Sequence, residues 1–196
     1  MITTLRFINM SVVLYKIQDN RLYIASDSII IRGGYVGSKN KKLQHIKDNV
    51  FFGAVGIVDT IQFMIEYLKE NDIPTNPSLL DLRKYFCDAC KLYCDTSYEP
   101  TKFDMTSFLF IGCDVYMITI NSEYESKIEI IKMDDNIGGI GWYDMGFGCM
   151  LSGDTPTEAL HKTIPYYTSI EYPIHQIVYD IENEFIMSDI FIDKVL

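Results

Sequence analysis

The sequence is short of basic residues, with 17 lysines and arginines against 27 aspartates and glutamates in 196 residues. The resulting formal net charge of −10 repels polyanions. Binding to nucleic-acid phosphates requires clustered lysine and arginine, and the only basic cluster, 39–42, is short. We therefore expect no nucleic-acid partner.

Long hydrophobic runs are also missing. No run reaches the roughly 18 to 20 apolar residues that span a bilayer, and the first ten residues lack the apolar core of a signal peptide. The five cysteines form an odd set without a framework spacing, which favours a reducing compartment over a disulfide-stapled secreted domain. We expect a soluble, cytoplasmic protein without a membrane partner.

Several chemical motifs are absent. The sequence contains no G-x-S-x-G elbow, no G-x-G-x-x-G and no phosphate-binding loop. Its three histidines, His45, His161 and His175, are scattered and form no H-E-x-x-H pair. Cys87, Cys90 and Cys94 share one face of a predicted helix, so a zinc module is one alternative, but a structural zinc site needs a fourth ligand. We interpret them as small core residues and expect no metal.

What the sequence has is enough apolar material for one substantial core, with 48% hydrophobic residues. Residues 12–17 and 21–26 are rich in β-branched and aromatic residues and are joined by a turn at 18–20, which predicts a β-hairpin. Apolar residues occur on both faces of these strands, so we expect the sheet to be covered on each side.

Helical spacing of apolar residues predicts helices over 57–71 and 78–94. A third helix is predicted to begin at Thr155, because Thr155-Pro156-Thr157-Glu158 has the pattern of a capping box, and Pro165 is expected to stop it. Further strands are predicted over 29–36, 50–55, 106–111, 115–120, 127–133, 174–181 and 185–192. This order predicts an α+β fold in which two antiparallel sheets are stacked between helices, a four-layer αββα sandwich.

The segment SVVLYKIQDNRLYIASD, from Ser11 to Asp27, resembles the start of a proteasome β-type or HslV-type subunit of the N-terminal-nucleophile hydrolases. Asp27 follows Ser11 by sixteen positions, as in that family. Further likeness comes from Lys41-Lys42, the run FFGAVGIVDT, Gly139-Ile140-Gly141, the helix start at Thr155, and Tyr167-Thr168-Ser169.

The resemblance implies roles for particular residues. Residues 1–10 would be an N-terminal extension or propeptide-like segment, and 11–196 a single domain. Ser11 would be the nucleophile, with Asp27 and Lys42 setting the electrostatics, and Lys41 the alternative to Lys42. Gly56 and Ser28 would contact the substrate. No cofactor is implied.

These residue types suit the reaction. An alcohol is a weak nucleophile until a base takes its proton, and a free α-amine with a pKa of about 7.7–8.0 is suited to that task. A buried lysine cation favours the alkoxide, and backbone N–H groups at a glycine strand end can stabilise an oxyanion. The implied activity is peptide-bond cleavage by a homo-oligomer, with an ATPase unfoldase ring as partner by analogy.

The sequence also departs from the family. Serine replaces the usual threonine at position 11, Met10 stands where the propeptide usually ends in glycine, and Trp142 follows Gly141 where a serine is common. Met10 also ties the Ser11 amine into a peptide bond. The alternative function is therefore a catalytically inactive assembly or binding protein with the same fold.

Overall fold

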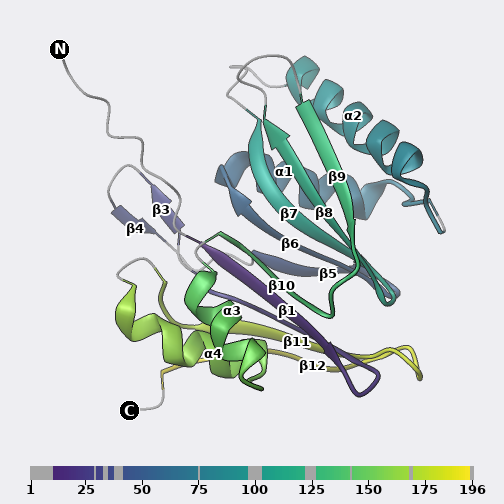
Figure 1. Cartoon of the computed structure of the whole chain (residues 1–196). Helices are drawn as coiled ribbons and strands as arrows, with labels where there is room; N and C mark the ends of the chain where they lie inside the picture. Colours follow the sequence, from purple (N-terminus) through teal and green to yellow (C-terminus); the bar gives the residue numbers. More distant parts are fainter. Residues whose placement is uncertain are drawn as a thin grey trace.

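Two five-stranded antiparallel sheets face each other in the computed structural model (Figure 1). The first sheet has the order β10-β1-β2-β11-β12 and the second the order β5-β6-β7-β8-β9. The structure describes residues 11–28, 30–32, 35–37, 42–74, 76–96, 103–121, 127–141, 143–167 and 170–194.

The strands of the first sheet are β1 (Val12–Gln18), β2 (Arg21–Ser26), β10 (Ile137–Gly141), β11 (Ile174–Asp180) and β12 (Phe185–Ile192). Those of the second sheet are β5 (Leu43–Lys47), β6 (Val50–Gly56), β7 (Asp104–Ile111), β8 (Asp114–Asn121) and β9 (Lys127–Met133). A separate hairpin pairs β3 (Ile30–Arg32) with β4 (Tyr35–Gly37). The helices are α1 (Val58–Glu70), α2 (Leu79–Thr96), α3 (Asp144–Leu151) and α4 (Pro156–Thr163), followed by the 3₁₀ helix η1 (Ile164–Tyr166).

Three hydrophobic cores separate the four layers. The central core lies between the sheets, where Tyr15 of β1 meets Phe108 of β7 with ring centroids 5.0 Å apart, and Phe51 of β6 meets Tyr179 of β11 at 5.1 Å. The second core packs α1 and α2 on the second sheet, and the third packs α3 and α4 on the first sheet. The predicted αββα sandwich is confirmed.

Most of the elements predicted from the sequence are present, with four differences, one of which is that helix α3 was not predicted. The strand predicted over 29–36 is two short strands, β3 and β4, which pair with each other. Strands β5 and β10 were missed: β5 contains polar and charged residues, and β10 has the sequence IGGIG, whose glycines have low strand propensity. Both are held in place by pairing, β10 with β1 and β5 with β6.

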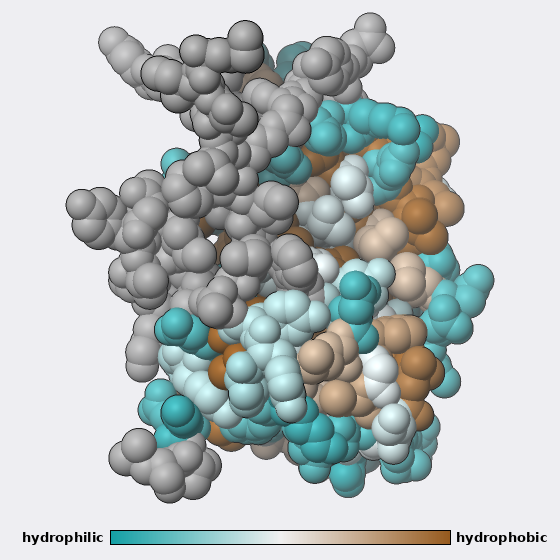
Figure 2. All heavy atoms as spheres, turned by 60° about the vertical axis from the view of Figure 1, so that its left-hand side comes forward, coloured by the Kyte–Doolittle hydropathy of each residue, from teal (hydrophilic) through white to brown (hydrophobic). Residues whose placement is uncertain are grey.

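The surface is mixed in character. Figure 2 shows hydrophobic residues exposed beside hydrophilic ones on one face. Leu80 of α2, Leu151 of α3 and Phe185 of β12 are among the large hydrophobic residues that solvent reaches. None of the helices within the described ranges combines the length and apolar character needed to cross a membrane.

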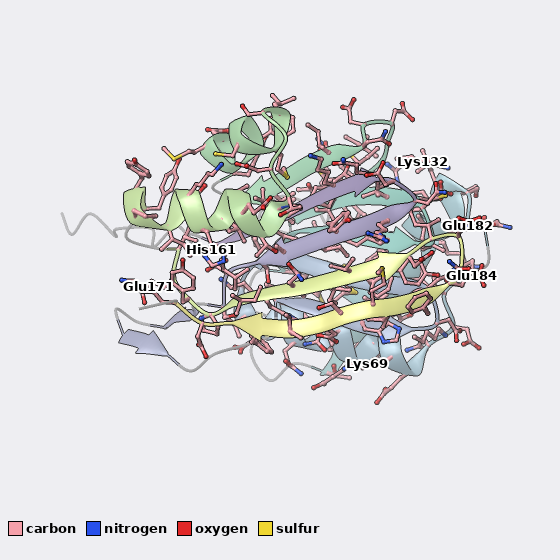
Figure 3. All side chains as sticks on the ribbon, turned by 90° about the horizontal axis from the view of Figure 1, so that it is seen from below. Lys69, Lys132, His161, Glu171, Glu182 and Glu184 are labelled. Carbon is pink, nitrogen blue, oxygen red and sulfur yellow. The ribbon has the colours of Figure 1, made fainter. Side chains whose placement is uncertain are left out.

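The first sheet has two distinct ends. Ser26 at the end of β2 is opposite His175 near the start of β11, whereas Arg21 at the other end of β2 is opposite Asp180. Figure 3 shows Glu184, in the turn between β11 and β12, far from His161 and Glu171, which lie at the other end of the sheet. The chain beyond Ser26 and the turn after Asp180 therefore lie at opposite ends of the sandwich.

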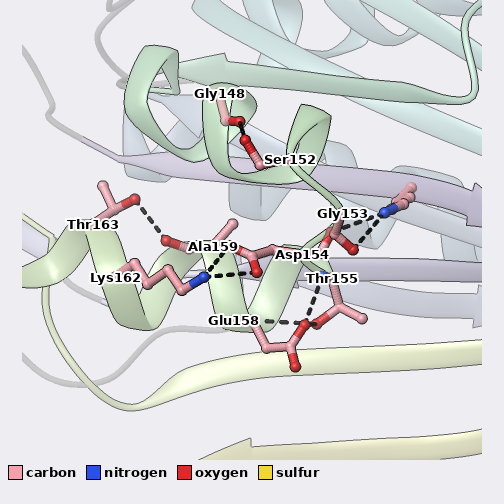
Figure 4. Close-up of polar contacts among 10 residues, drawn as sticks. Gly148, Ser152, Gly153, Asp154, Thr155, Glu158, Ala159, Lys162 and Thr163 are labelled. Atoms are coloured by element: carbon pink, nitrogen blue, oxygen red, sulfur yellow. Dashed lines mark hydrogen bonds and ion pairs between the residues drawn. The ribbon is translucent and has the colours of Figure 1, made fainter.

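The turn between α3 and α4 is fixed by polar contacts (Figure 4). The Thr155 hydroxyl accepts a hydrogen bond from the Glu158 N–H, and the Glu158 carboxylate accepts one from the Thr155 N–H at 2.8 Å, which is the predicted capping box.

Two lysines also hold this turn. Lys162 pairs with Asp154 at 2.6 Å, and Lys16 of β1 donates to the carbonyl oxygens of Gly153 and Asp154. Helix α4 ends at Thr163, and Pro165 lies in η1, as expected from the sequence.

We predict that Thr155→Ala lowers the free energy of unfolding by about 1 kcal/mol, because the two hydrogen bonds of the Thr155 hydroxyl are lost, whereas Thr155→Ser retains most of this stability. Hydrogen bonds from Thr155 lower the pKa of Glu158 below its ordinary value of 4.5. The backbone N–H of residue 155 still donates to Glu158 in the variant, so only the part of the difference that comes from the Thr155 hydroxyl donating to the Glu158 carboxylate depends on pH. That part is fully present above pH 4.5 and shrinks as the pH falls below it. Urea unfolding at several pH values measures this, and equal stability of the two proteins would contradict it.

Candidate functional site

A buried ion pair lies between the two sheets, close to the start of β1. The Lys42 ammonium donates to Asp27 Oδ2 at 2.7 Å, and the two side chains are 7% and 0% exposed. Asp27 follows the end of β2 in the first sheet, and Lys42 immediately precedes β5 in the second. The pair therefore connects the two sheets at the end of the sandwich where β2 finishes and β5 starts.

The Asp27 carboxylate also contacts the backbone beside Ser11. Its Oδ1 atom accepts a hydrogen bond from the Val12 N–H at 2.9 Å, while Oδ2 accepts from Lys42. One carboxylate thus joins the first residues of β1 to the cation of the opposite sheet. The structure brings together Asp27, Lys42 and the backbone next to Ser11, and the catalytic roles of these residues stay a prediction.

Burial governs the electrostatics of this pair. Burial lowers the pKa of the Lys42 ammonium below its ordinary value, and the Asp27 carboxylate partly offsets that effect. The Lys42 carbonyl oxygen accepts a hydrogen bond from the Ala54 N–H at 3.0 Å, which fixes the lysine backbone against β6. Lys42 immediately precedes β5, and its backbone is paired with β6 just before β5 begins.

Gly141 determines how closely β10 approaches Ser11. Gly141 has a φ of +83°, and a Cβ atom at this position would overlap the Ser11 carbonyl oxygen. Only glycine fits both the backbone conformation and the space. Sequence reasoning noted Gly141 as part of a glycine-rich motif but missed this role, because the partner is 130 positions away in the chain.

Gly56, predicted to contact substrate, ends β6 with a φ of +142°. A Cβ atom there would come within 2.5 Å of the Asp104 carbonyl oxygen on β7. The fold itself therefore requires glycine at this position, and contact of Gly56 with substrate stays a prediction. Gly56 lies two residues after Ala54, the hydrogen-bond partner of Lys42, at the same end of the second sheet.

Two buried serines flank Asp27. Ser26 and Ser28 are both enclosed, and neither hydroxyl has a hydrogen-bond partner among the described residues. A buried hydroxyl without a partner loses the hydrogen bond that water would give it, so these groups are candidates for contact with a bound molecule. Ser28 was predicted as a substrate contact and stays so, whereas Ser26 was missed because its isolated position in β2 carries no motif.

Several residues named from the sequence lie outside the described residues: Met10 with the rest of residues 1–10, Lys41, Trp142, Thr168 and Ser169. The alternative choice of Lys41 in place of Lys42 therefore has no structural description. Lys42 is the described lysine that contacts Asp27.

The cysteine alternative gains no support from the structure. No group of three or more histidine, cysteine, aspartate or glutamate side chains is suited to hold a metal ion within the described ranges. Cys90 is buried in the core under α2, and burial raises its thiol pKa to about 12, while Cys87 and Cys94 are exposed. A thiol with that pKa is a poor metal ligand at neutral pH.

The stacked sheets and flanking helices define a proteasome-like fold. BPH from Thiobacillus denitrificans, in complex with epoxomicin, is similar with a TM-score of 0.71 and 13% identity over 87% of this chain and 98% of that one. Anbu (ancestral beta-subunit) from Yersinia bercovieri is similar with a TM-score of 0.70 and 14% identity, over 93% of this chain and 87% of that one. Anbu from Pseudomonas aeruginosa, solved as a helical assembly, has a TM-score of 0.69 and 15% identity over the same shares.

At these identities the likeness shows the fold alone. No protein-family model matches the sequence, and no curated protein matches it significantly. The recognition made from the sequence needs correction: the similar structures are Anbu and BPH proteins, and the HslV-type assignment was wrong. The spacing of Ser11, Asp27 and Lys42 did not distinguish an HslV-type protein from other proteins with a proteasome-like fold.

We predict that Gly141→Ala lowers the free energy of unfolding by about 2 to 5 kcal/mol, because it combines backbone strain with an overlap at Ser11. Gly148→Ala is the matched control. Gly148 lies in α3 with no atom near its missing side chain, so alanine should leave stability unchanged or raise it by up to about 1 kcal/mol. Chemical denaturation measures both, and equal effects of the two substitutions would show that Gly141 does not set the position of Ser11.

Proposed function

We propose that this chain is a proteasome-like subunit that cleaves peptide bonds through Ser11 after residues 1–10 are removed. The observation that carries the proposal is the Asp27 carboxylate, which accepts hydrogen bonds from both Lys42 and the Val12 N–H beside Ser11. This contact would hold the new N-terminus next to a buried cation. Such a cation favours the deprotonated form of a neighbouring alcohol.

In the proposed reaction, the freed α-amine of Ser11 takes the proton from Ser11 Oγ, and Oγ attacks the substrate carbonyl carbon. The C–N bond then breaks, and the leaving amine takes up the proton. Water hydrolyses the resulting ester and regenerates the serine. Backbone N–H groups near Gly56 are candidates to stabilise the oxyanion, and Ser28 is a candidate substrate contact.

The same proposal includes assembly into a homo-oligomer. Anbu from Pseudomonas aeruginosa forms a helical assembly, and this chain has the same fold. Exposed Leu80, Leu151 and Phe185 supply apolar surface that contact with a second copy would cover. An ATPase unfoldase ring as partner and a cytoplasmic location stay predictions by analogy.

The second candidate function is a catalytically inactive assembly or binding protein. Two observations in the sequence favour it: Met10 replaces the glycine that usually precedes the nucleophile, and Trp142 replaces a serine that the resemblance leads us to expect. A buried Asp27–Lys42 pair would then serve to connect the two sheets, without chemistry. The fold is compatible with either role.

We predict that a chain beginning at Ser11, with a free amine, forms a covalent adduct with epoxomicin, the compound in the BPH structure. The reason is that its amine and hydroxyl would then both be available. Intact-mass spectrometry measures the adduct. Ser11→Ala should abolish it, while Ser152→Ala, at an exposed serine after α3, should leave it unchanged. A folded Ser11-starting chain that forms no adduct with this or other hydroxyl-directed electrophiles would support the inactive alternative.

A further inference from the structure

A cavity lies at the end of the sandwich away from Ser11. It has a volume of about 350 Å³ and is lined by turns from both sheets, including Asp48 and Asn49 between β5 and β6, Gly112 between β7 and β8, and Glu184 between β11 and β12. We refer to it as the distal cavity. Figure 3 shows Glu184 at this end, with Glu171 at the other. Its volume falls within the range of small-ligand sites.

The walls of the distal cavity are tied together by hydrogen bonds. The Gly112 N–H donates to the Asn49 carbonyl oxygen at 2.9 Å, which joins two turns of the second sheet. On the first sheet, the Ile181 N–H donates to the Asn20 carbonyl oxygen at 2.9 Å. A ring nitrogen of His45 lies 2.9 Å from the Asp48 carbonyl oxygen. The cavity is therefore formed before any ligand arrives, which reduces the entropy lost on binding.

Tyr179 closes the inner end of the cavity. The residue is 1% exposed, its ring packs against Phe51 in the central core, and it lines the distal cavity. Its hydroxyl has no hydrogen-bond partner among the described residues. Burial, together with the nearby Glu184 and Asp180 carboxylates, raises the tyrosine pKa, so the hydroxyl stays neutral and can both donate and accept a hydrogen bond.

The charges around the cavity favour a cation. Among its lining groups, Asp114 is neutralised by Lys132 at 2.9 Å and Lys47 by Asp72 at 2.6 Å. The carboxylates of Asp48 and Glu184 also line the cavity, and neither forms an ion pair with a described residue. These two carboxylates therefore leave negative charge at the opening, in a protein whose formal net charge is −10.

We propose that the distal cavity binds a guanidinium or ammonium group, carried by a small free amine or by a basic side chain of a polypeptide. The cation lies between the Glu184 and Asp48 carboxylates, and one N–H donates to the Tyr179 hydroxyl oxygen. Charge-assisted hydrogen bonds to carboxylates supply most of the affinity, and the Tyr179 hydroxyl, which faces the cavity, gains a partner from the ligand. The site is separate from Ser11, so it does not depend on the proposed peptidase activity.

Isothermal titration calorimetry of the full chain with agmatine and with N-acetyl-arginine methylamide tests the proposal. We expect saturable binding of one molecule per chain. Glu184→Gln should weaken it about fivefold to tenfold and Tyr179→Phe about threefold, because each removes one hydrogen-bonding group without changing shape. Tighter binding of agmatine indicates a free amine as ligand, and tighter binding of the capped arginine indicates a polypeptide side chain.

Matched controls separate a specific site from the general negative field. Glu171→Gln removes the same charge at the opposite end of the sheet and should change affinity less than twofold (Figure 3). N-acetyl-citrulline methylamide has the shape of the arginine probe without its charge and should not bind. No saturable binding of either cation, equal losses from Glu171→Gln and Glu184→Gln, or citrulline binding as tight as arginine binding would each overturn the proposal.

Discussion

The buried contact between Asp27 and Lys42 is the interaction on which this account of the structure depends. It links the end of β2 in one sheet to the start of β5 in the other, at the end of the sandwich where β1 begins. Removing two charges from water is costly, and the cost is offset only when geometry and further hydrogen bonds are favourable. Here the carboxylate has both, because it also accepts the Val12 N–H.

The same contact has two distinct consequences, one structural and one electrostatic. As a structural link it positions the first residues of β1, with Gly141 allowing β10 to approach Ser11 closely. As an electrostatic feature it places a lysine cation on the same carboxylate that accepts the Val12 N–H, next to Ser11 in the chain. The first consequence follows from the observed contacts, whereas the second requires a free Ser11 amine. The proteasome-like fold is therefore compatible with a peptidase and with an inactive relative.

Local patterns predicted the fold well where the signal lies within a few residues. The hairpin of β1 and β2 and the capping box at Thr155 both depend on neighbouring side chains, and both are present. Strand β10 was not predicted because its extended conformation depends on pairing with β1. No local pattern in its sequence, IGGIG, reveals that pairing. The spacing of Ser11 and Asp27 indicated a candidate site whose residue roles stay predictions, whereas the Gly141 contact and the distal cavity join segments far apart in sequence and carry no local signal. The HslV-type assignment failed because that spacing is too general.

A double-mutant cycle on Asp27 and Lys42 measures whether the two side chains link the sheets as an ion pair. The free energy of unfolding would be measured for Asp27→Asn, Lys42→Met and the double variant. If the pair links the sheets as a buried ion pair, each single change should cost about 3 to 5 kcal/mol, because it leaves the partner buried without compensation. The double variant should then be more stable than the sum of the single costs implies, with a coupling energy of about 2 kcal/mol or more. Costs that add to within about 0.5 kcal/mol would contradict the claim.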